Sequence, residues 1–512
     1  ERDMEANAST TKRNPDLILD VNESPKKVSQ WLILAVQHVL AMFVACITVP
    51  LIVYSGYTDV NGVSMAQTMI APTLVAAGIG TIIYLLLTKM KSPVFLASSF
   101  AYMAPMEAAL SLGGTGEPNL WALPIGMAFV GVVYVIVALV IKFCGVGWLN
   151  KLLPTIVIGP VIMVIGLSLS TSAISNLTSS NSTTDSSYNL VSIACGLIAM
   201  IVTAICSHYG KKTVALIPFV LGMLAGYVAA AIFTGIGYYG CGNDYFRVID
   251  WTPLIKNFSP VTWKSFFSLP EFLFITSDYT YAPITGSQIG TIALLFIPVS
   301  FVTICEHIGD HKNLSGILSR DLLVDPGLTN TLMGDGIATA VSGLVCGAAN
   351  TTYGENVAVV GVTKIASTKV VFLAACMAVA LGFLSPVMAL TMTIPNCVTG
   401  GVSLILYGFI AASGVKMLIN EHIDMGNTKN IFVASVILVS GIGGLAFKFG
   451  DPTNPVISIT SIAVSMILGI IMNLILSDKK LKNKNKKPEE IKDSTAPAVN
   501  EVKPSEQASV NK

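Results

Sequence analysis

Two acidic residues lie inside stretches that are apolar enough to cross a membrane. Glu306 follows the run TIALLFIPVSFVTIC, and Glu355 lies in the polar run NTTYGEN between two apolar segments. A carboxylate near the bilayer centre costs at least ~2.5–3.5 kcal/mol on insertion scales, so such a residue is a candidate for function. Two carboxylates can accept N–H groups from a small planar molecule with alternating donors and acceptors, such as a nucleobase. An anion fits poorly beside two acids unless one of them is protonated.

The polar run at 350–356 predicts an interrupted helix. Irregular backbone at membrane depth occurs only where it is buried in protein or lines a cavity. The apolar stretch that follows, from Asn356 to about Ile365, makes a helix of only ~15 Å, or half a bilayer. Its free N–H groups and positive dipole end would meet a ligand, and Gly354 would let that ligand approach the backbone closely. A purely structural role for Glu355 is the alternative.

Further ionisable residues follow Glu306 along the chain. Asp310 lies four residues later, on the same helix face, while His307 lies about 100° around the helix. We expect the helix to end near residue 309, so that His311 begins a loop. A solvated position near the membrane surface is therefore the alternative to function for both Asp310 and His311. For Glu306 the alternative is a carboxylate paired with another helix for structure alone.

Polar and aromatic side chains elsewhere could complete a site. His38 in the first apolar segment could join a network with Asn356, or it could simply hydrogen-bond across helices. Tyr353 and Tyr407 could stack on a flat ligand, although packing and interfacial positions are the usual roles of membrane tyrosines.

The composition of the chain identifies the elements that must position these residues. Of the 512 residues, 53% are hydrophobic and only 12% are charged, compared with ~25% in soluble domains. The chain is therefore an integral membrane protein with many spans. Its nine cysteines are scattered without a metal-binding or redox spacing, so we expect no metal. An enzyme is disfavoured because neither a nucleophile–base pair nor a metal-ligand cluster is visible.

About fourteen apolar segments can be counted, most of them near the ~20 residues that cross a bilayer as a helix. They lie near 31–55, 66–88, 92–112, 119–143, 149–174, 189–208, 212–236, 287–309, 330–348, 350–366, 368–393, 397–418, 430–448 and 454–477.

Lysine and arginine concentrate in the connections after even-numbered segments and at both ends of the chain. The positive-inside rule then places both termini in the cytoplasm. The long connection after the seventh segment is basic yet must be external, and long loops often escape the rule. The stretch 175–188 should be a polar external loop, and the tail beyond Ser477 should be disordered.

The two halves of the chain echo one another. Gln37-His38 in the first segment corresponds to Glu306-His307 in the eighth, and the interruption at Ser98-Ser99-Phe100 corresponds to the polar run at 350–356. Because seven spans is an odd number, a second half that repeats the first must be inverted in the membrane. Interrupted segments at matching places in two inverted halves indicate a transporter site.

These motifs carry a family resemblance over roughly Gln37 to Leu476. They are QHVLAMFVACITVP (37–50), SSFAYMAP (98–105), EHIGDH (306–311), RDLLVDPGL (320–328), NTTYGENVAVVGVTK (350–364) and GGVSLILYG (400–408). They resemble the nucleobase–ascorbate transporter family, and within it they are most similar to the bacterial uracil–proton symporters. The resemblance implies secondary transport of uracil with a proton into the cell, across the cytoplasmic membrane.

The resemblance also implies the fold, an all-α polytopic membrane protein of fourteen spans in two inverted seven-span repeats. Spans 3 and 10 would each contain a short strand, and the two strands would pair antiparallel at the bilayer centre. The implied units are a cytoplasmic tail (1–30), a core domain (31–145 and 287–393), a gate domain (146–286 and 394–477) and a disordered tail (478–512).

A set of site residues follows from the same resemblance. Glu306 and Glu355 would accept N–H groups of uracil, while backbone groups at Gly354 and Phe100 would meet the ring carbonyls. Ala45, Tyr353 and Tyr407 would line the pocket, between spans 1, 3, 8, 10 and 12. Proton coupling would involve Glu306, Asp310, His38 and Asn356, with His38 bonded to Asn356. The proton is the coupling ion, and no cofactor, metal or nucleic acid is implied. Homodimers are common in the family.

Two positions bear on substrate and mechanism. The uracil symporters often have histidine where this chain has Asp310, so a role in proton relay passes to Asp310 or His311, or is absent. Purine-selective relatives commonly have glutamine at the position of Glu355, and a carboxylate there favours the two N–H donors of uracil. The alternatives are a xanthine, urate or other purine permease of the same family, and an anion exchanger or channel on the same kind of fold.

Overall fold

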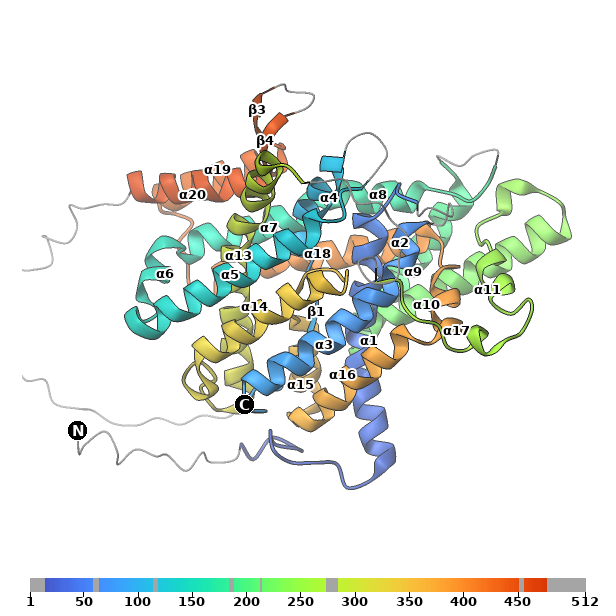
Figure 1. The fold of residues 1–512 in the computed structure, drawn as a ribbon, viewed down its shortest axis with the longest axis horizontal. Coiled ribbons are helices and arrows are strands. Elements are labelled where there is room, and N and C mark those ends of the chain that lie inside the picture. Colours follow the sequence, from blue (N-terminus) through green and yellow to red (C-terminus); the bar gives the residue numbers. More distant parts are fainter. Residues whose placement is uncertain are drawn as a thin grey trace, which may run out of the picture.

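The structure is a computed structural model that describes residues 14–58, 64–113, 118–183, 188–211, 214–272, 284–450 and 455–476. The tail expected to be disordered beyond Ser477 lies outside these residues, as do residues 184–187 of the stretch 175–188. The expectation that this whole stretch is a loop is wrong at its start, because residues 175–178 belong to a helix that runs from Ser170 to Thr178. Within the described ranges the protein is mostly helical, as Figure 1 shows.

Eight helical stretches among the described residues are long and apolar enough to cross a membrane, so the chain is a polytopic membrane protein. They are α1 (Val28–Val53), α2 with α3 (Met65–Thr68 and Ile70–Leu87), α5 (Ala122–Cys144), α7 with α8 (Thr155–Ser168 and Ser170–Thr178), α9 (Leu190–Tyr209), α10 with η4 (Pro218–Phe233 and Thr234–Gly240), α13 (Gly286–Leu318) and α18 (Asn396–Asn420). Three shorter apolar helices are α16 (Thr368–Gly382), α19 (Thr428–Ile442) and α20 (Ser461–Ile475).

The remaining elements are short or interrupted. The helices are α4 (Met103–Leu110), α6 (Gly147–Leu152), α11 (Thr252–Asn257), α14 (Leu328–Leu344), α15 (Gly354–Thr363) and α17 (Ser385–Thr391). The strands are β1 (Leu96–Ser98), β2 (Asn350–Thr352), β3 (Phe447–Gly450) and β4 (Pro455–Ile459). Single helical turns are η1 (Phe100–Tyr102), η2 (Ser111–Gly113), η3 (Val214–Leu216), η5 (Asp244–Phe246), η6 (Trp263–Ser265) and η7 (Leu323–Gly327).

Two interrupted segments meet through the three-residue strands β1 and β2. They pair antiparallel, with Leu96 opposite Thr352, Ala97 opposite Thr351 and Ser98 opposite Asn350. Both strands are fully buried. Each strand leads into a short helix, because η1 and α4 follow β1 while α15 follows β2. The backbone groups that leave the helical ladder are thus satisfied by one another inside the protein, as membrane depth requires.

Helices surround this strand pair (Figure 1). α3, α5, α14 and α16 pack in a group beside the strands, while α9 to α11 lie at one end of the molecule and α19 with α20 at the other. α5 and α14 approach closely because both have glycine at the crossing. A Cβ atom on Gly336 would lie 2.4 Å from Cβ of Tyr134, and one on Gly131 would lie 3.0 Å from the main-chain oxygen of Gly336. Small residues permit such close helix contacts in membranes.

Helix α13 extends further than the sequence suggested. It runs for 33 residues to Leu318, a length of ~50 Å. The expectations that this span ends near residue 309 and that His311 begins a loop are therefore wrong. His311 is inside the helix and is fully buried. Neighbouring elements satisfy its polar ring, and the helix can therefore continue where the local sequence suggested an end.

Candidate functional site

The short helix α15 begins directly at the strand pair. The main-chain N–H of Tyr353 donates to the oxygen of Phe95 at 3.1 Å, and Asn350 Nδ2 donates to the main-chain oxygen of Ala76 at 2.8 Å. These bonds fix the polar run against α3 and the strand β1. α15 then starts at Gly354, and Glu355 lies in its first turn. The N-terminus of a helix, whose first N–H groups lack partners within the helix, therefore lies inside the fold, with Gly354 and Glu355 half-buried between buried Tyr353 and Asn356.

Helix α13 passes beside this N-terminus. It contacts α15, β2, η1 and α4. The carboxylate of Asp310 faces Gly354, since a Cβ atom built on the glycine would lie 3.5 Å from Asp310 Oδ1. Glu306 and Asp310 lie four residues apart on α13, and Glu355 lies in the first turn of α15, the helix that α13 contacts here. The structure thus places Glu355 on a helix that contacts α13, which carries both Glu306 and Asp310.

Aromatic and small side chains surround the same region. Phe100 packs edge-on against Tyr407 of α18, with ring centres 5.9 Å apart. Tyr353 and Ala45 are buried. Ala45 precedes Cys46, whose Sγ accepts a 3.5 Å hydrogen bond from Ser98 Oγ of β1. Helices α1 and α18 therefore contribute to the surroundings of the strand pair from two sides.

The bond implied between His38 and Asn356 is present. Asn356 Nδ2 lies 3.3 Å from His38 Nδ1 and donates to the main-chain oxygen of His38 at 3.1 Å. Both residues are buried. This contact joins α1 to the first turn of α15, one residue after Glu355.

A second polar cluster joins α13 to α14 and β2, and it was not predicted from the sequence. His307 Nδ1 lies 2.8 Å from Asp335 Oδ2 of α14 and 2.7 Å from Thr352 Oγ1 of β2. Asp335 also accepts a 3.3 Å bond from Thr352. The three side chains are buried. Asp335 could have been found, because it is an acid inside the predicted span 330–348 and so meets the criterion that selected Glu306.

The cluster continues through His311. Its Nδ1 lies 2.8 Å from the main-chain oxygen of His307, and its Nε2 lies 2.6 Å from the Tyr84 hydroxyl. A carbonyl can only accept, so Nδ1 of His311 donates, and in the neutral ring Nε2 accepts from Tyr84. The rings of His307 and His311 stack with centres 4.0 Å apart. His311 is thus fixed in a network that joins α13 to α3, away from the Asp310 face.

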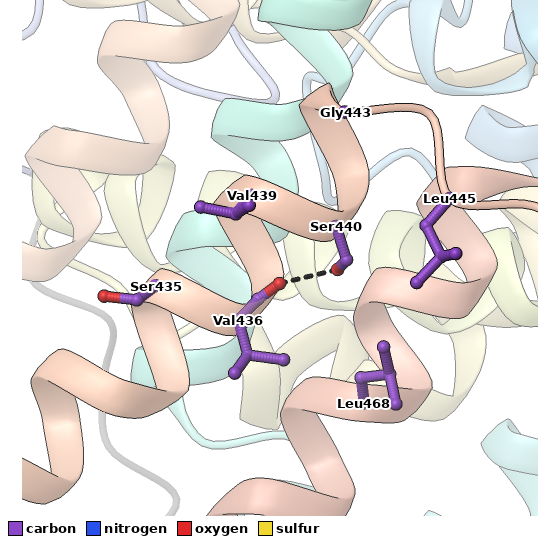
Figure 2. Close-up of a pocket in the computed structure, with 7 residues that line it drawn as sticks. All are labelled: Ser435, Val436, Val439, Ser440, Gly443, Leu445 and Leu468. Carbon is purple, nitrogen blue, oxygen red and sulfur yellow. Dashed lines mark hydrogen bonds between the residues drawn. The ribbon is translucent and has the colours of Figure 1, made fainter.

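Figure 2 shows a groove elsewhere in the molecule, between α19 and α20. It has a volume of about 530 Å³ and is lined by Ser435, Val436, Val439, Ser440, Gly443, Leu445 and Leu468. Ser440 Oγ donates to the main-chain oxygen of Val436 at 2.6 Å, so this hydroxyl is satisfied within its own helix. The apolar lining contains no ionisable side chain. α19 and α20 lie at the edge of the fold, apart from the strand pair (Figure 1).

The described residues do not contain a group of three or more His, Cys, Asp or Glu side chains that could hold a metal ion. The acids near α15 instead form a cluster whose chemistry is hydrogen bonding and proton exchange. Carboxylates accept N–H groups, and carboxylic acids can release protons.

Comparisons with known proteins place these features in a wider context. A xanthine–uracil permease model, described as a permease family, matches residues 29–449. The chain is 39% identical over 459 residues to the uracil permease of Bacillus caldolyticus, a match that covers 90% of this chain and 94% of the relative. It is 36% identical to the uracil permease of Bacillus subtilis, with 90% and 96% covered. The uracil permease of Escherichia coli K12 is 32% identical, with 89% and 93% covered.

Solved structures with a similar fold are more distant in sequence. The transmembrane domain of the cyanobacterial bicarbonate transporter BicA matches with a TM-score of 0.56 at 12% identity, covering 88% of this chain and 99% of that one. The murine anion transporter Slc26a9 matches with a TM-score of 0.58 at 11% identity, covering 88% and 69%. These likenesses show that the chain has a transporter fold.

Proposed function

The chain belongs to the nucleobase–ascorbate transporter family, and from this premise we propose that it imports uracil together with a proton. The relatives are named permeases and not enzymes, and the chain is accordingly a nucleobase permease. The observation that carries the proposal is that α13, which carries Glu306 and Asp310, passes beside the start of α15, where Asp310 faces Gly354 and Glu355 lies in the first turn. Uracil has two N–H donors and two carbonyl acceptors, which match two carboxylates and free backbone N–H groups.

The ring of the substrate lies between spans 1, 3, 8, 10 and 12 in this proposal. Glu306 and Glu355 accept the N–H groups, and backbone groups at Phe100 and Gly354 meet the carbonyls. Phe100 and Tyr407 pack edge-on, with their ring centres 5.9 Å apart. This contact supports an aromatic wall on one side of the proposed pocket. Buried Ala45 and Tyr353 complete the lining from α1 and from the residue before α15.

Proton coupling follows from the number of acids. Asp310 lies on α13 with Glu306 and faces the start of α15, which carries Glu355, whereas the buried side chains in the described residues include no lysine or arginine. Asp335 is buried and the other three acids are half-buried, and ionising all four carboxylates so close together would cost repulsion, so in this proposal some of them hold protons. Uracil is neutral near pH 7, and a co-transported proton adds ~2.3 kcal/mol of driving force per 100 mV.

The relay residue in this proposal is Asp310. Its carboxylate faces Gly354 at the start of α15, whereas His311 is held by Tyr84 and by the main chain of His307. In this proposal Asp310 therefore exchanges the proton near Glu306 and the substrate. The hydrogen bond between His38 and Asn356 fixes the first turn of α15. In this proposal the two residues affect proton coupling by setting the position of that turn.

The topology in the proposal has fourteen spans in two inverted repeats, with both termini in the cytoplasm of a cell membrane. The pairing of β1 from the first half with β2 from the second supports the repeat. Interrupted segments that meet at mid-membrane are typical of transporters in which one domain moves against the other. The core domain comprises spans 1–4 and 8–11, and it moves against the gate domain, with homodimers as in other members of the family.

The proposal is tested by uptake of radiolabelled uracil into vesicles with an imposed pH gradient. Uptake should be accelerated by external acid and lost in both Glu306→Gln and Glu355→Gln. Glu421→Gln is the matched control, because this exposed acid lies at the far end of α18. Normal uptake by both site variants would refute the site. Strong competition by xanthine would favour a purine permease, and bicarbonate exchange without uracil uptake would favour an anion exchanger.

A further inference from the structure

The chain segment before α1 is folded against the helices that carry the acids. Residues 14–25, with the sequence NPDLILDVNESP, follow the surface around the ends of α13, α15 and α16. Leu17 and Val21 are only 3% and 2% exposed and belong to the main hydrophobic core. Such burial fixes the segment in place, unlike a solvated tail.

The segment caps the end of α15. This helix ends at Thr363, and the next residue, Lys364, adopts a left-handed conformation with φ 58°. The main-chain oxygen of Lys364 accepts the N–H groups of Ile18 at 2.8 Å and Leu19 at 3.3 Å, and the N–H of Ala366 donates to Leu19 at 2.8 Å. The chain leaving a helix end lacks partners within the helix, and here the segment supplies partners to the residues that follow α15.

The same segment also caps the end of α13. Asn14 Nδ2 donates to the main-chain oxygen of Ile317 at 2.9 Å, in the last turn of the helix. Just beyond that turn, Arg320 forms an ion pair with Asp20, whose side chain is only 12% exposed. The other carboxylate oxygen of Asp20 accepts the N–H of Val21 at 2.7 Å.

The start of α16 is the third attachment. Ser367 Oγ donates to the main-chain oxygen of Glu23 at 2.6 Å, and Thr368 donates to that of Val21 through both its N–H, at 3.0 Å, and its hydroxyl, at 2.9 Å. Three helix ends are therefore joined by one stretch of twelve residues.

We propose that residues 14–25 form a clasp that sets the position of α15 relative to α13, and thereby the spacing of the acids at the substrate site. The inference rests on the proposed function of that site. α15 has only ten residues and a length of ~15 Å, so it moves as a rigid rod. A shift at its capped end is thus transmitted to Glu355 at the other end. Asp20 and Arg320 are positioning residues, because they join the clasp to α13 without touching the substrate.

The test uses charge reversal in the full chain. Asp20→Arg and Arg320→Asp should each raise the KM for uracil about tenfold with a smaller change in maximal rate, because small displacements of binding groups weaken substrate contacts strongly. The double variant restores an ion pair of opposite direction and should return KM to within about twofold of the parent. The matched control reverses Lys91 and Asp325, an exposed pair at 2.7 Å whose loss should leave KM unchanged.

Hydrogen exchange provides a readout that does not depend on transport. Amides at 360–366 should exchange faster in both single variants and normally in the double variant, because the cap on α15 is lost and regained. If the parent protein does not transport uracil but the amides exchange as expected in the variants, the proposed function is wrong and the clasp is still supported. Unchanged exchange in the single variants would overturn the clasp. So would an unchanged KM, or a double variant that stays as impaired as the single variants.

Discussion

Asp310 and Gly354 face each other across the gap between α13 and α15. A Cβ atom on Gly354 would meet only the carboxylate of Asp310, at 3.5 and 3.7 Å, which are ordinary contact distances. The fold therefore has room for a methyl group at this position. If glycine is required there, the requirement comes from a ligand that approaches the backbone.

Gly354→Ala should therefore weaken uracil binding without affecting the stability of the fold. We expect normal thermal stability without substrate, together with at least a tenfold increase in the KM for uracil, because the methyl group occupies the approach to the backbone. Uptake kinetics and thermal unfolding in detergent measure the two effects.

Gly80→Ala is the contrasting variant. A Cβ atom there would lie 2.6 Å from Asn350 Nδ2, which anchors β2, so the melting temperature itself should fall. A normal KM in Gly354→Ala would mean that substrate does not approach this part of the backbone.

Asp335→Ala should destabilise the protein without a direct contact to substrate. The substitution leaves His307 Nδ1 and Thr352 Oγ1 without their shared carboxylate in a buried site. The two groups stay 2.7 Å from each other, so the substitution removes their hydrogen bonds to the carboxylate, which contribute about 0.5–1.5 kcal/mol each. Thermal unfolding should show a clear fall in melting temperature, whereas Asp321→Ala, at an exposed position, should have little effect. Equal stability of the two variants would contradict a structural role for this network.

Asp310→Asn should abolish the coupling of uracil uptake to the proton gradient and leave uracil binding intact. The amide retains the size of the carboxyl group but cannot exchange a proton, so stimulation of uptake by an inward pH gradient should be lost. Exchange of labelled for unlabelled uracil at equal pH should persist. His311→Asn is the comparison, because His311 is fixed by Tyr84 and His307. If His311→Asn instead abolished the pH response while Asp310→Asn kept it, the relay assignment would be reversed.

Uracil should stabilise the folded protein by an amount that grows with the logarithm of its concentration above Kd. Ligand at 100 times its Kd contributes about 2.7 kcal/mol to the free energy of unfolding, which appears as an increase in melting temperature. Glu355→Gln should remove most of this increase at the same uracil concentration. The opposite pattern, with xanthine stabilising the parent more than uracil, would indicate a purine site.

Much of the architecture could be predicted from local sequence. The polar run at 350–356 predicted an interruption between apolar segments, and β2 followed by the ten-residue α15 occupies that position. Such predictions succeed because the membrane imposes a local rule on every span, and departures from the rule are visible residue by residue. The end of α13 was mispredicted near residue 309 because local polarity suggested a loop, whereas distant partners satisfy His311.

The sequence by itself determined that this is a membrane protein, that acids lie inside its spans and which family they resemble. Only the tertiary structure decided that Asp310 faces Gly354, that Asp335 joins His307 and Thr352, and that residues 14–25 cap α13 and α15. The physical reason is that hydropathy acts along the chain within about twenty residues, whereas these contacts join positions up to several hundred residues apart. Their partners are chosen by packing and by the need to satisfy each buried polar group, which no local pattern records.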